Sequence, residues 1–122
     1  MGKNIDILVV DDEQGYHDLF TYMLEPLGIH VTCACNGKEA LERVEGKAYD
    51  LILMDFQFRD LEGHKICDMI RTDDKLKHIP IFMITGHREL NEAYLKAYGA
   101  TEVVYKPIDR NDLLAKINKY LL

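Results

Sequence analysis

The sequence predicts an α/β protein built on a doubly wound, five-stranded parallel sheet in which each strand is followed by a helix. Short apolar runs alternate along the chain with stretches whose apolar residues recur at helical spacing. Several runs have no polar face, as expected of parallel strands that helices cover on both sides. The 122 residues fit one domain of ordinary size, spanning 1–122.

Five apolar runs are the expected strands: Ile5–Val10, Val31–Cys35, Leu51–Met54, Ile81–Ile84 and Val103–Tyr105. Apolar residues at helical spacing mark five expected helices: Leu19, Phe20, Met23, Leu24 and Leu27; Ala40, Leu41 and Val44; Ile66, Cys67 and Ile70; Leu90, Ala93, Tyr94 and Ala97; and Leu113, Leu114, Ile117 and Leu121. Gly28 and Gly99 close the first and fourth of these helices. Asp109 suits the N-cap of the fifth, with Asp112 at its capping-box position.

The charge balance narrows the function classes. Fifteen basic against twenty-one acidic side chains give a net charge of −6, which disfavours nucleic acid and anionic membranes as direct partners. The apolar runs fall well short of the about 20 residues that a transmembrane helix needs, and residues 1–4 are unlike a signal peptide. Three cysteines do not form a disulfide framework. A reducing cytoplasm is therefore the expected location.

Chemically active side chains stand at the ends of four expected strands. Asp11 and Asp12 follow the first strand, Asp55 the third, Thr85 the fourth and Lys106 the fifth. In doubly wound sheets the site lies beyond the carboxyl ends of the strands. We therefore expect three carboxylates, a hydroxyl and an ammonium group to converge at one edge of the sheet.

This set of groups suits phosphoryl transfer. Carboxylates held close together repel one another, and Mg²⁺ offsets such charge because it prefers carboxylate, water and phosphate oxygens. A carboxylate can act as the nucleophile toward phosphorus. Lysine supplies a mobile positive charge for a phosphoryl oxygen, and threonine supplies a hydroxyl donor. Positioning and charge stabilisation are most of what phosphoryl transfer requires.

The same residues carry a family resemblance that spans nearly the whole chain. The matching pieces are Ile7–Glu13, Gly28–Val31, Asn36–Leu41, Tyr49–Asp55, Gly63, Pro80–Ile81, Thr85–Gly86, Gly99–Ala100 and Lys106–Pro107. With these pieces the chain resembles a receiver domain of the two-component response regulators. The resemblance implies a flavodoxin-like (βα)5 fold with strand order 2-1-3-4-5.

The resemblance also implies residue roles. Asp55 is then the phosphoacceptor, and Asp11 and Asp12 hold Mg²⁺, with Asp12 the more direct ligand. Gln57 adds its backbone carbonyl to the metal. Thr85 and Lys106 contact the phosphoryl group, and the bond from this lysine to Pro107 is similar to one that is often cis in the family.

The implied donor is a histidine kinase or a histidine phosphotransfer protein, and phosphorylation then changes binding to an output domain or a downstream protein. Such a chain is not an enzyme in the classified sense, because it only phosphorylates itself from a donor and dephosphorylates itself. Gln57 and His87 lie two residues after Asp55 and Thr85 respectively. We expect these two side chains to flank the water that hydrolyses the aspartyl-phosphate.

Three departures from the family pattern bear on the output switch. Phe58 and Arg59 stand where the family usually has Met-Pro, and Gly86 stands where alanine is frequent. Val103 occupies the position of the switch aromatic, and its side chain is short and stiff. We expect a weakened switch, carried by the loop after Thr85 and by Leu90 and Tyr94 of the fourth helix. A second route would use Tyr105, which strand alternation places on the same face as Val103.

Other readings stay open at this stage. An α/β phosphohydrolase also uses an aspartyl nucleophile but needs a second acid two residues later, where this chain has Gln57. A flavodoxin-like redox protein would place acidic residues against its FMN phosphate, and a degenerate receiver would bind partners without phosphorylation. His30, Cys33 and Cys35 fit a packed strand better than a metal site. The remaining histidines are expected at the surface: His17, His64, His78 and His87.

Overall fold

The computed structural model describes residues 4–56, 63–89 and 91–121. Its centre is a five-stranded parallel sheet in the order β2-β1-β3-β4-β5. The strands are β1 (Ile5–Val10), β2 (Ile29–Ala34), β3 (Leu51–Asp55), β4 (Ile81–Thr85) and β5 (Glu102–Tyr105). The fold class and the strand order expected from the sequence are therefore confirmed. β2 begins two residues earlier than expected because Ile29 pairs with Ile5 of β1.

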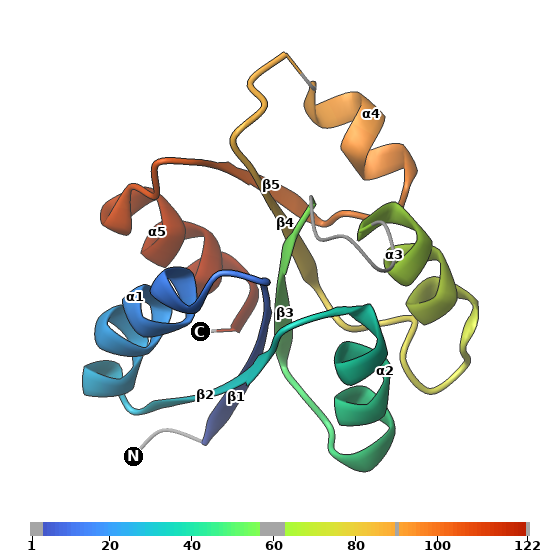
Figure 1. Ribbon diagram of the computed structural model, residues 1–122, viewed down its shortest axis with the longest axis horizontal. Helices are drawn as coiled ribbons and strands as arrows, with labels where there is room; N and C mark the ends of the chain where they lie inside the picture. The colour runs from blue at the N-terminus through green and yellow to red at the C-terminus, as the bar shows by residue number, and fades with distance from the viewer. Residues whose placement is uncertain (1–3, 57–62, 90, 122) are drawn as a thin grey trace.

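Helices cover both faces of this sheet (Figure 1). The helical segments are α1 (Gln14–Leu24), the short 3₁₀ helix η1 (Glu25–Leu27), α2 (Gly37–Gly46), α3 (Gly63–Thr72), α4 (Glu92–Ala97) and α5 (Arg110–Leu121). α1 and α5 lie against one face, and α2, α3 and α4 lie against the other. Within the described ranges, none of these helices is both long enough and apolar enough to cross a membrane.

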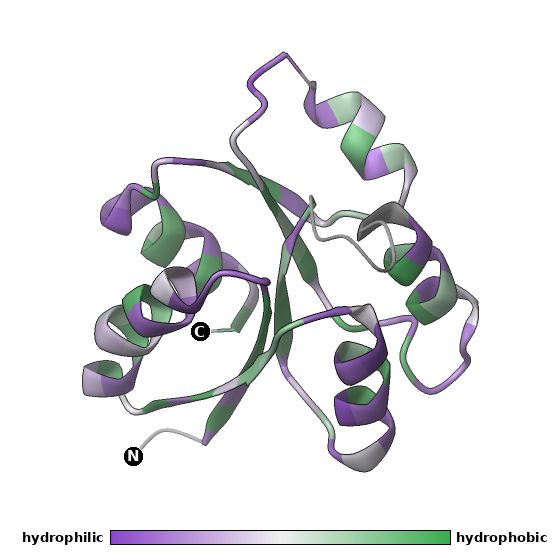
Figure 2. Cartoon of the chain, viewed as in Figure 1, coloured by the Kyte–Doolittle hydropathy of each residue, from purple (hydrophilic) through white to green (hydrophobic). Residues whose placement is uncertain are grey.

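The core consists of two apolar clusters, one on each face of the sheet. Ile7 and Val9 of β1 point toward α1 and α5, whereas Leu8 and Val10 point toward α2, α3 and α4. All four side chains are at most 1% exposed. The strands are accordingly mostly apolar, while the helices are apolar on the sides that meet the sheet (Figure 2). This burial on both faces explains why the strands read as continuous apolar runs.

The first helix differs from the expected stripe. Phe20 and Leu24 are buried as expected, but Leu19 is 37% and Leu27 52% exposed. α1 ends at Leu24, and the chain continues as a 3₁₀ turn with Pro26 near its start and Gly28 at φ 85°. That change of helix type takes Leu27 off the inward face. The inward position one turn before Phe20 belongs to His17, which is 3% exposed, so its expected surface location is wrong.

The fourth helix corrects a second expectation. Ala93, Tyr94 and Ala97 are exposed, and the buried residue of this six-residue helix is Leu95. Leu90, the first member of the expected stripe, lies outside the described residues. Asn91 caps the helix by accepting a hydrogen bond from the Tyr94 backbone N–H at 2.7 Å. Leu95 belongs to the core cluster on the α2, α3 and α4 face, and this contact defines the buried side of the short helix.

Asp109 caps α5 as expected, because its Oδ1 accepts a hydrogen bond from the Asp112 backbone N–H at 3.0 Å. The carboxylate of Asp112 does not complete a capping box. It accepts from Nζ of Lys116, one turn later, at 2.8 and 2.9 Å. The start of the helix thus keeps one of the two bonds that the sequence suggested.

Candidate active site

Three carboxylates meet at the carboxyl edge of the sheet. Asp11 and Asp12 follow β1 directly, and Asp55 is the last residue of β3, the strand beside it. One carboxylate oxygen of each lies within 4.8 Å of the other two. Asp11 is 1% and Asp55 4% exposed, whereas Asp12 faces solvent. The convergence of these three side chains is therefore as the sequence predicted.

The backbone and side chain of Asp11 are held by hydrogen bonds. Its N–H donates to the carbonyl of Ala34 at 3.0 Å, and its Oδ1 accepts from the Glu13 N–H at 2.9 Å. Its carbonyl lies 2.6 Å from Nε2 of the buried His17. A carbonyl oxygen only accepts, so this nitrogen of the imidazole carries the proton. These three hydrogen bonds hold Asp11 in place at the end of β1, directly before the exposed Asp12.

The pKa of Asp11 is raised from 3.8 to about 6, chiefly by burial and in addition by the negative charge of the nearby Asp55 carboxylate. The hydrogen bond from Glu13 and the positive charge of Lys106 act in the opposite direction. The effect of the Asp55 charge exceeds that of Lys106, so the ammonium only partly offsets the repulsion between the two carboxylates. A cation would relieve it.

Lys106 follows β5 and directs its ammonium group into the cluster. Nζ lies 3.5 Å from Oδ1 of Asp55 and 3.8 Å from Oδ2 of Asp11. Burial lowers the pKa of Lys106, but Asp55, Asp11 and Tyr16 together raise it by more, so that the net pKa lies above its ordinary value. The peptide bond between Lys106 and Pro107 is cis, as the resemblance implied.

Thr85 ends β4, the strand between those of Asp55 and Lys106. It is fully buried, and its Oγ1 accepts a hydrogen bond from the His87 backbone N–H at 3.0 Å. Its carbonyl accepts from the Lys106 N–H at 2.8 Å. The hydroxyl keeps its own proton for another acceptor. Gln57, the remaining expected member of the site, lies outside the described residues.

A hard divalent cation fits this donor set. Mg²⁺ binds oxygen ligands, commonly one or two carboxylates completed by water and phosphate oxygens. Asp11, Asp12 and Asp55 offer such oxygens close together, and the Asp55 charge raises the pKa of Asp11 by more than the Lys106 charge lowers it. The residues present therefore suit the metal that the sequence pattern implied.

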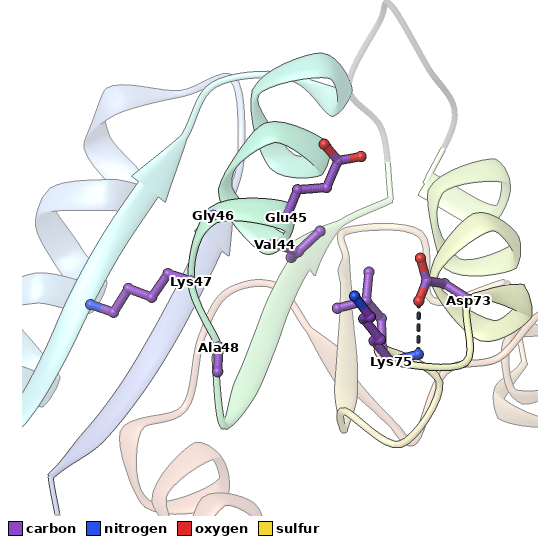
Figure 3. Close-up of a pocket in the computed structure, with 8 residues that line it drawn as sticks. Val44, Glu45, Gly46, Lys47, Ala48, Asp73 and Lys75 are labelled. Carbon is purple, nitrogen blue, oxygen red and sulfur yellow. Dashed lines mark hydrogen bonds between the residues drawn. The ribbon is translucent and has the colours of Figure 1, made fainter.

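A pocket lies at the amino end of the sheet, opposite the acidic edge (Figure 3). It has a volume of about 450 Å³ and lies between the end of α2 and the loop that joins α3 to β4. Of its charged residues, Lys47 pairs with Asp6 at 2.9 Å, and the Asp73 carboxylate accepts from the Lys75 N–H at 2.8 Å. These charged groups are paired with nearby residues and support the local structure. The candidate active site is therefore the acidic edge and not this pocket.

The structure adds two residues that the sequence did not single out for the site, Tyr16 and His17 on the first turn of α1. His17 bonds the carbonyl of Asp11, and the Tyr16 ring lies against Lys106. A polar residue at helical spacing from Phe20 was the available signal for His17. Nothing in the apolar pattern signalled Tyr16, because its contact depends on the direction of two side chains.

Comparison with known proteins gives a consistent result. The family model described as "Response regulator receiver domain" matches residues 7–118. The "Probable transcriptional regulator ycf27" of Cyanidium caldarium is 35% identical over 94% of this chain and 45% of its own length. An "Uncharacterized 14.6 kDa protein in sodA1 3'region" of Leptolyngbya boryana is 32% identical, with 97% of this chain and 91% of the relative covered. The chain spans less than half the length of the ycf27 relative.

Solved structures agree in fold. The chemotaxis response regulator CheY4 of Vibrio cholerae superposes with a TM-score of 0.89 and 27% identity, over 98% of this chain and all of the other. The receiver domain of the sensor histidine kinase PA1611 of Pseudomonas aeruginosa gives a TM-score of 0.88 and 27% identity, over 98% of both chains. The latter structure is described with a magnesium ion coordinated in its active site cleft.

Proposed function

Because the chain belongs to the family of response regulator receiver domains, we propose that residues 1–122 form one receiver that takes a phosphoryl group onto Asp55 in the cytoplasm. The donor is a histidine kinase or a histidine phosphotransfer protein, and Mg²⁺ is the cofactor. The observation that carries the proposal is the convergence of Asp11, Asp12 and Asp55 with Lys106, whose Nζ lies 3.5 Å from the Asp55 carboxylate.

Asp55 acts as the nucleophile. One of its carboxylate oxygens forms a bond to phosphorus, while the bond from phosphorus to the donor nitrogen breaks and leaves its electron pair on the donor imidazole. The product is an aspartyl-phosphate. Asp11, Asp12, Asp55 and the backbone carbonyl of Gln57 would hold Mg²⁺, which supplies charge neutralisation to the carboxylates and the phosphoryl oxygens.

Lys106 and Thr85 stabilise the product. The ammonium of Lys106 already pairs with the Asp55 carboxylate, and a phosphoryl oxygen on that residue is a stronger acceptor at nearly the same place. The buried hydroxyl of Thr85 donates to a second phosphoryl oxygen. Neither residue needs to transfer a proton, since positioning and charge account for most of the catalysis in such reactions.

Intact-mass measurement after incubation with acetyl phosphate and Mg²⁺ tests the proposal. We expect one added phosphoryl group, which EDTA prevents and Asp55→Asn abolishes. Asp74→Asn is the matched control, because the Asp74 side chain is 93% exposed and remote from the acidic edge. A degenerate receiver would show no labelling of the wild type, and undiminished labelling of Asp55→Asn would refute the phosphoacceptor assignment.

The output switch is proposed to run through the loop after Thr85 and through α4. Val103 is 1% exposed and belongs to the cluster on the α2, α3 and α4 face, against which the Tyr105 ring also packs. The Arg88 guanidinium lies 5.3 Å from the centre of the Tyr105 ring. A short, buried valine leaves no large ring to move at position 103, so a weaker coupling gives a smaller gain in partner binding.

NMR spectra of the free and beryllofluoride-bound protein distinguish the two routes. We expect the largest chemical-shift changes in residues 86–98 and smaller ones at the Tyr105 ring. Strong shifts of the Tyr105 ring with residues 86–98 unchanged would show that Tyr105 is the moving element and that α4 is not.

A further inference from the structure

The first turn of α1 places an aromatic ring against the ammonium group of the site. Nζ of Lys106 lies over the ring of Tyr16, 4.0 Å from its centre. The same nitrogen lies 3.5 Å from Oδ1 of Asp55 and 3.8 Å from Oδ2 of Asp11. The ammonium therefore contacts two carboxylates and the face of one ring.

Tyr16 is itself anchored in the core. Its ring centre lies 6.3 Å from that of Phe20, one turn further along α1, at an interplanar angle of 35°. Phe20 is fully buried in the cluster beneath α1 and α5, and Tyr16 packs against that cluster. Aromatic side chains four residues apart on a helix are neighbours. A chain of contacts therefore runs from the core through Phe20 and Tyr16 to Lys106.

The ring offsets part of the desolvation of the Lys106 ammonium. This side chain is only 16% exposed, so its ammonium has lost much of the water that would otherwise solvate it. The face of an aromatic ring attracts a cation, and the attraction grows as the cation loses water. Lysine has a long, freely rotating side chain, so a fixed ring on one side reduces the number of positions that Nζ can occupy.

We infer that Tyr16 is a positioning residue for Lys106: its ring keeps the ammonium beside the Asp55 carboxylate, where the phosphoryl group arrives. This inference deepens the proposed function and rests on it. Without the ring, Lys106 would still be attracted by the carboxylates but would spend part of its time turned toward solvent. The consequence is a slower gain of the phosphoryl group, with the affinity for Mg²⁺ left unchanged.

NMR of the metal-free protein tests the placement independently of any phosphorylation. Ring currents should shift the Cε protons of Lys106 upfield in the wild type and in Tyr16→Phe, and the shift should disappear in Tyr16→Leu. Tyr22→Leu is the matched control, because Tyr22 lies on the same helix and is 80% exposed. Unshifted Lys106 protons in the wild type would overturn the inference at this first step.

The functional test measures the initial rate of phosphorylation from acetyl phosphate and the calorimetric affinity for Mg²⁺. We expect Tyr16→Leu to lower the rate about three- to tenfold, the range that a partly desolvated cation–π contact gives. Tyr16→Phe should restore the rate to within about twofold, because the ring face rather than the hydroxyl makes the contact, and Tyr22→Leu should leave it unchanged.

The outcomes separate the two proposals. A wild type that is not labelled contradicts the proposed function, whereas a labelled wild type with equal rates in Tyr16→Leu contradicts only the role of Tyr16. A parallel loss of Mg²⁺ affinity in Tyr16→Leu would also overturn it, since it would show that the change acts through the carboxylates or the fold. Tyr16→Met keeps an apolar chain of similar reach and replaces Tyr16→Leu if the latter is unstable.

Discussion

α1 and α4 both follow strand ends that carry site residues, yet they are attached to the protein in different ways. α1 has eleven residues and buries His17, Phe20, Met23 and Leu24. α4 has six residues, of which Leu95 is the buried one. Two tyrosines, Tyr94 of α4 and Tyr98 directly after it, are 43% and 41% exposed. The site therefore lies between a deeply anchored helix and a lightly anchored one.

The contacts with the site divide in the same way. α1 reaches it through His17 at the Asp11 carbonyl and through Tyr16 at Lys106. The segment before α4 reaches it through the His87 N–H, which donates to the Thr85 hydroxyl. The positions of Asp11 and Lys106 are therefore fixed from the α1 side. The α4 side has little buried area to hold it in one arrangement. An element that responds to phosphorylation is expected on the side with the lower local stability.

The largest effects should come from removing the main core contact of each helix. Phe20→Ala is expected to lower the free energy of unfolding by about 3–5 kcal/mol, and Leu95→Ala by about 2–3 kcal/mol. Urea denaturation measures both. Hydrogen exchange should show that Leu95→Ala loses protection mainly in α4, whereas Phe20→Ala loses it throughout. Leu19→Ala, at a 37% exposed position of α1, is the control. Equal global loss in both variants would remove the contrast between the helices.

The far end of α4 is held by Arg71 of α3. Its guanidinium donates five hydrogen bonds, to the carbonyls of Gly99 (3.0 and 2.8 Å), Lys77 (2.9 Å) and Ile79 (2.6 Å) and to the Thr101 hydroxyl (3.2 Å). Arg71→Gln is expected to cost about 2–3 kcal/mol, because partly buried carbonyls lose a charged donor. The measurement is urea denaturation together with hydrogen exchange of α4.

Arg43→Gln is the control for Arg71→Gln. Arg43 is an exposed residue of α2, so its substitution removes the same charge and leaves the hydrogen bonds of Arg71 in place. Unchanged exchange in α4 after Arg71→Gln would mean that its C-terminal end is held by other contacts. A loss confined to α4 and the corner after it would show that Arg71 fixes one end and leaves the site end to move.

On the anchored side, α5 is fastened at its last turn. The Tyr120 hydroxyl donates to Glu102 at 2.6 Å, and this bond holds the pKa of Glu102 below its ordinary value of 4.5. A lowered folded-state pKa stabilises the fold above the unfolded pKa, and that stabilisation is lost as pH falls through the folded pKa. Tyr120→Phe keeps the ring against Phe82 and should cost about 1 kcal/mol at pH 7.

Thermal unfolding between pH 3 and pH 7 checks this expectation. The difference between wild type and Tyr120→Phe should be full at neutral pH and should shrink as the pH drops below about 4.5. A difference that stays constant over the whole range would show that the hydroxyl acts without the charge of Glu102.

The smallest effect concerns the segment before α4. The His87 ring is 46% exposed, and its Nδ1 lies 2.7 Å from the Glu89 carboxylate. His87→Ala is expected to change the half-life of the aspartyl-phosphate about threefold by altering the approach of water, with Mg²⁺ affinity unchanged; threefold corresponds to about 0.7 kcal/mol. Decay of labelled protein after removal of the donor measures it. His78→Ala, at another exposed histidine, should decay like the wild type.

The sequence predicted the sheet and most of the acidic edge for a physical reason. Strands buried on both faces are apolar throughout, and the ends of parallel strands meet at one edge, so Asp11, Asp55 and Lys106 follow from the strand assignment alone. The strand order came from the family resemblance, because apolar runs carry no information about which strands are neighbours.

The helices were predicted less well. His17 is buried because its ring donates to a carbonyl, and a search for apolar residues passes over such a position. In α4 the buried residue is Leu95 while Ala93 and Ala97 are exposed, so the stripe through these two alanines was wrong; a helix of six residues is too short for its apolar spacing to define one face. The contact of Tyr16 with Lys106 joins α1 to the end of β5 and depends on rotamers that no local pattern records.

The corner at Gly99 has a consequence for engineering. Gly99 has φ 107°, and a Cβ atom built there would lie 3.0 Å from Cγ of Arg71. The Arg71 side chain therefore occupies the space that any larger residue at position 99 would need, and its guanidinium bonds the carbonyl of that same glycine. A chimera that takes α4 from a homologue should be spliced so that Arg71, Gly99 and Thr101 stay together from one parent. A junction between these residues would separate the Arg71 side chain from the Gly99 backbone that it packs against and bonds.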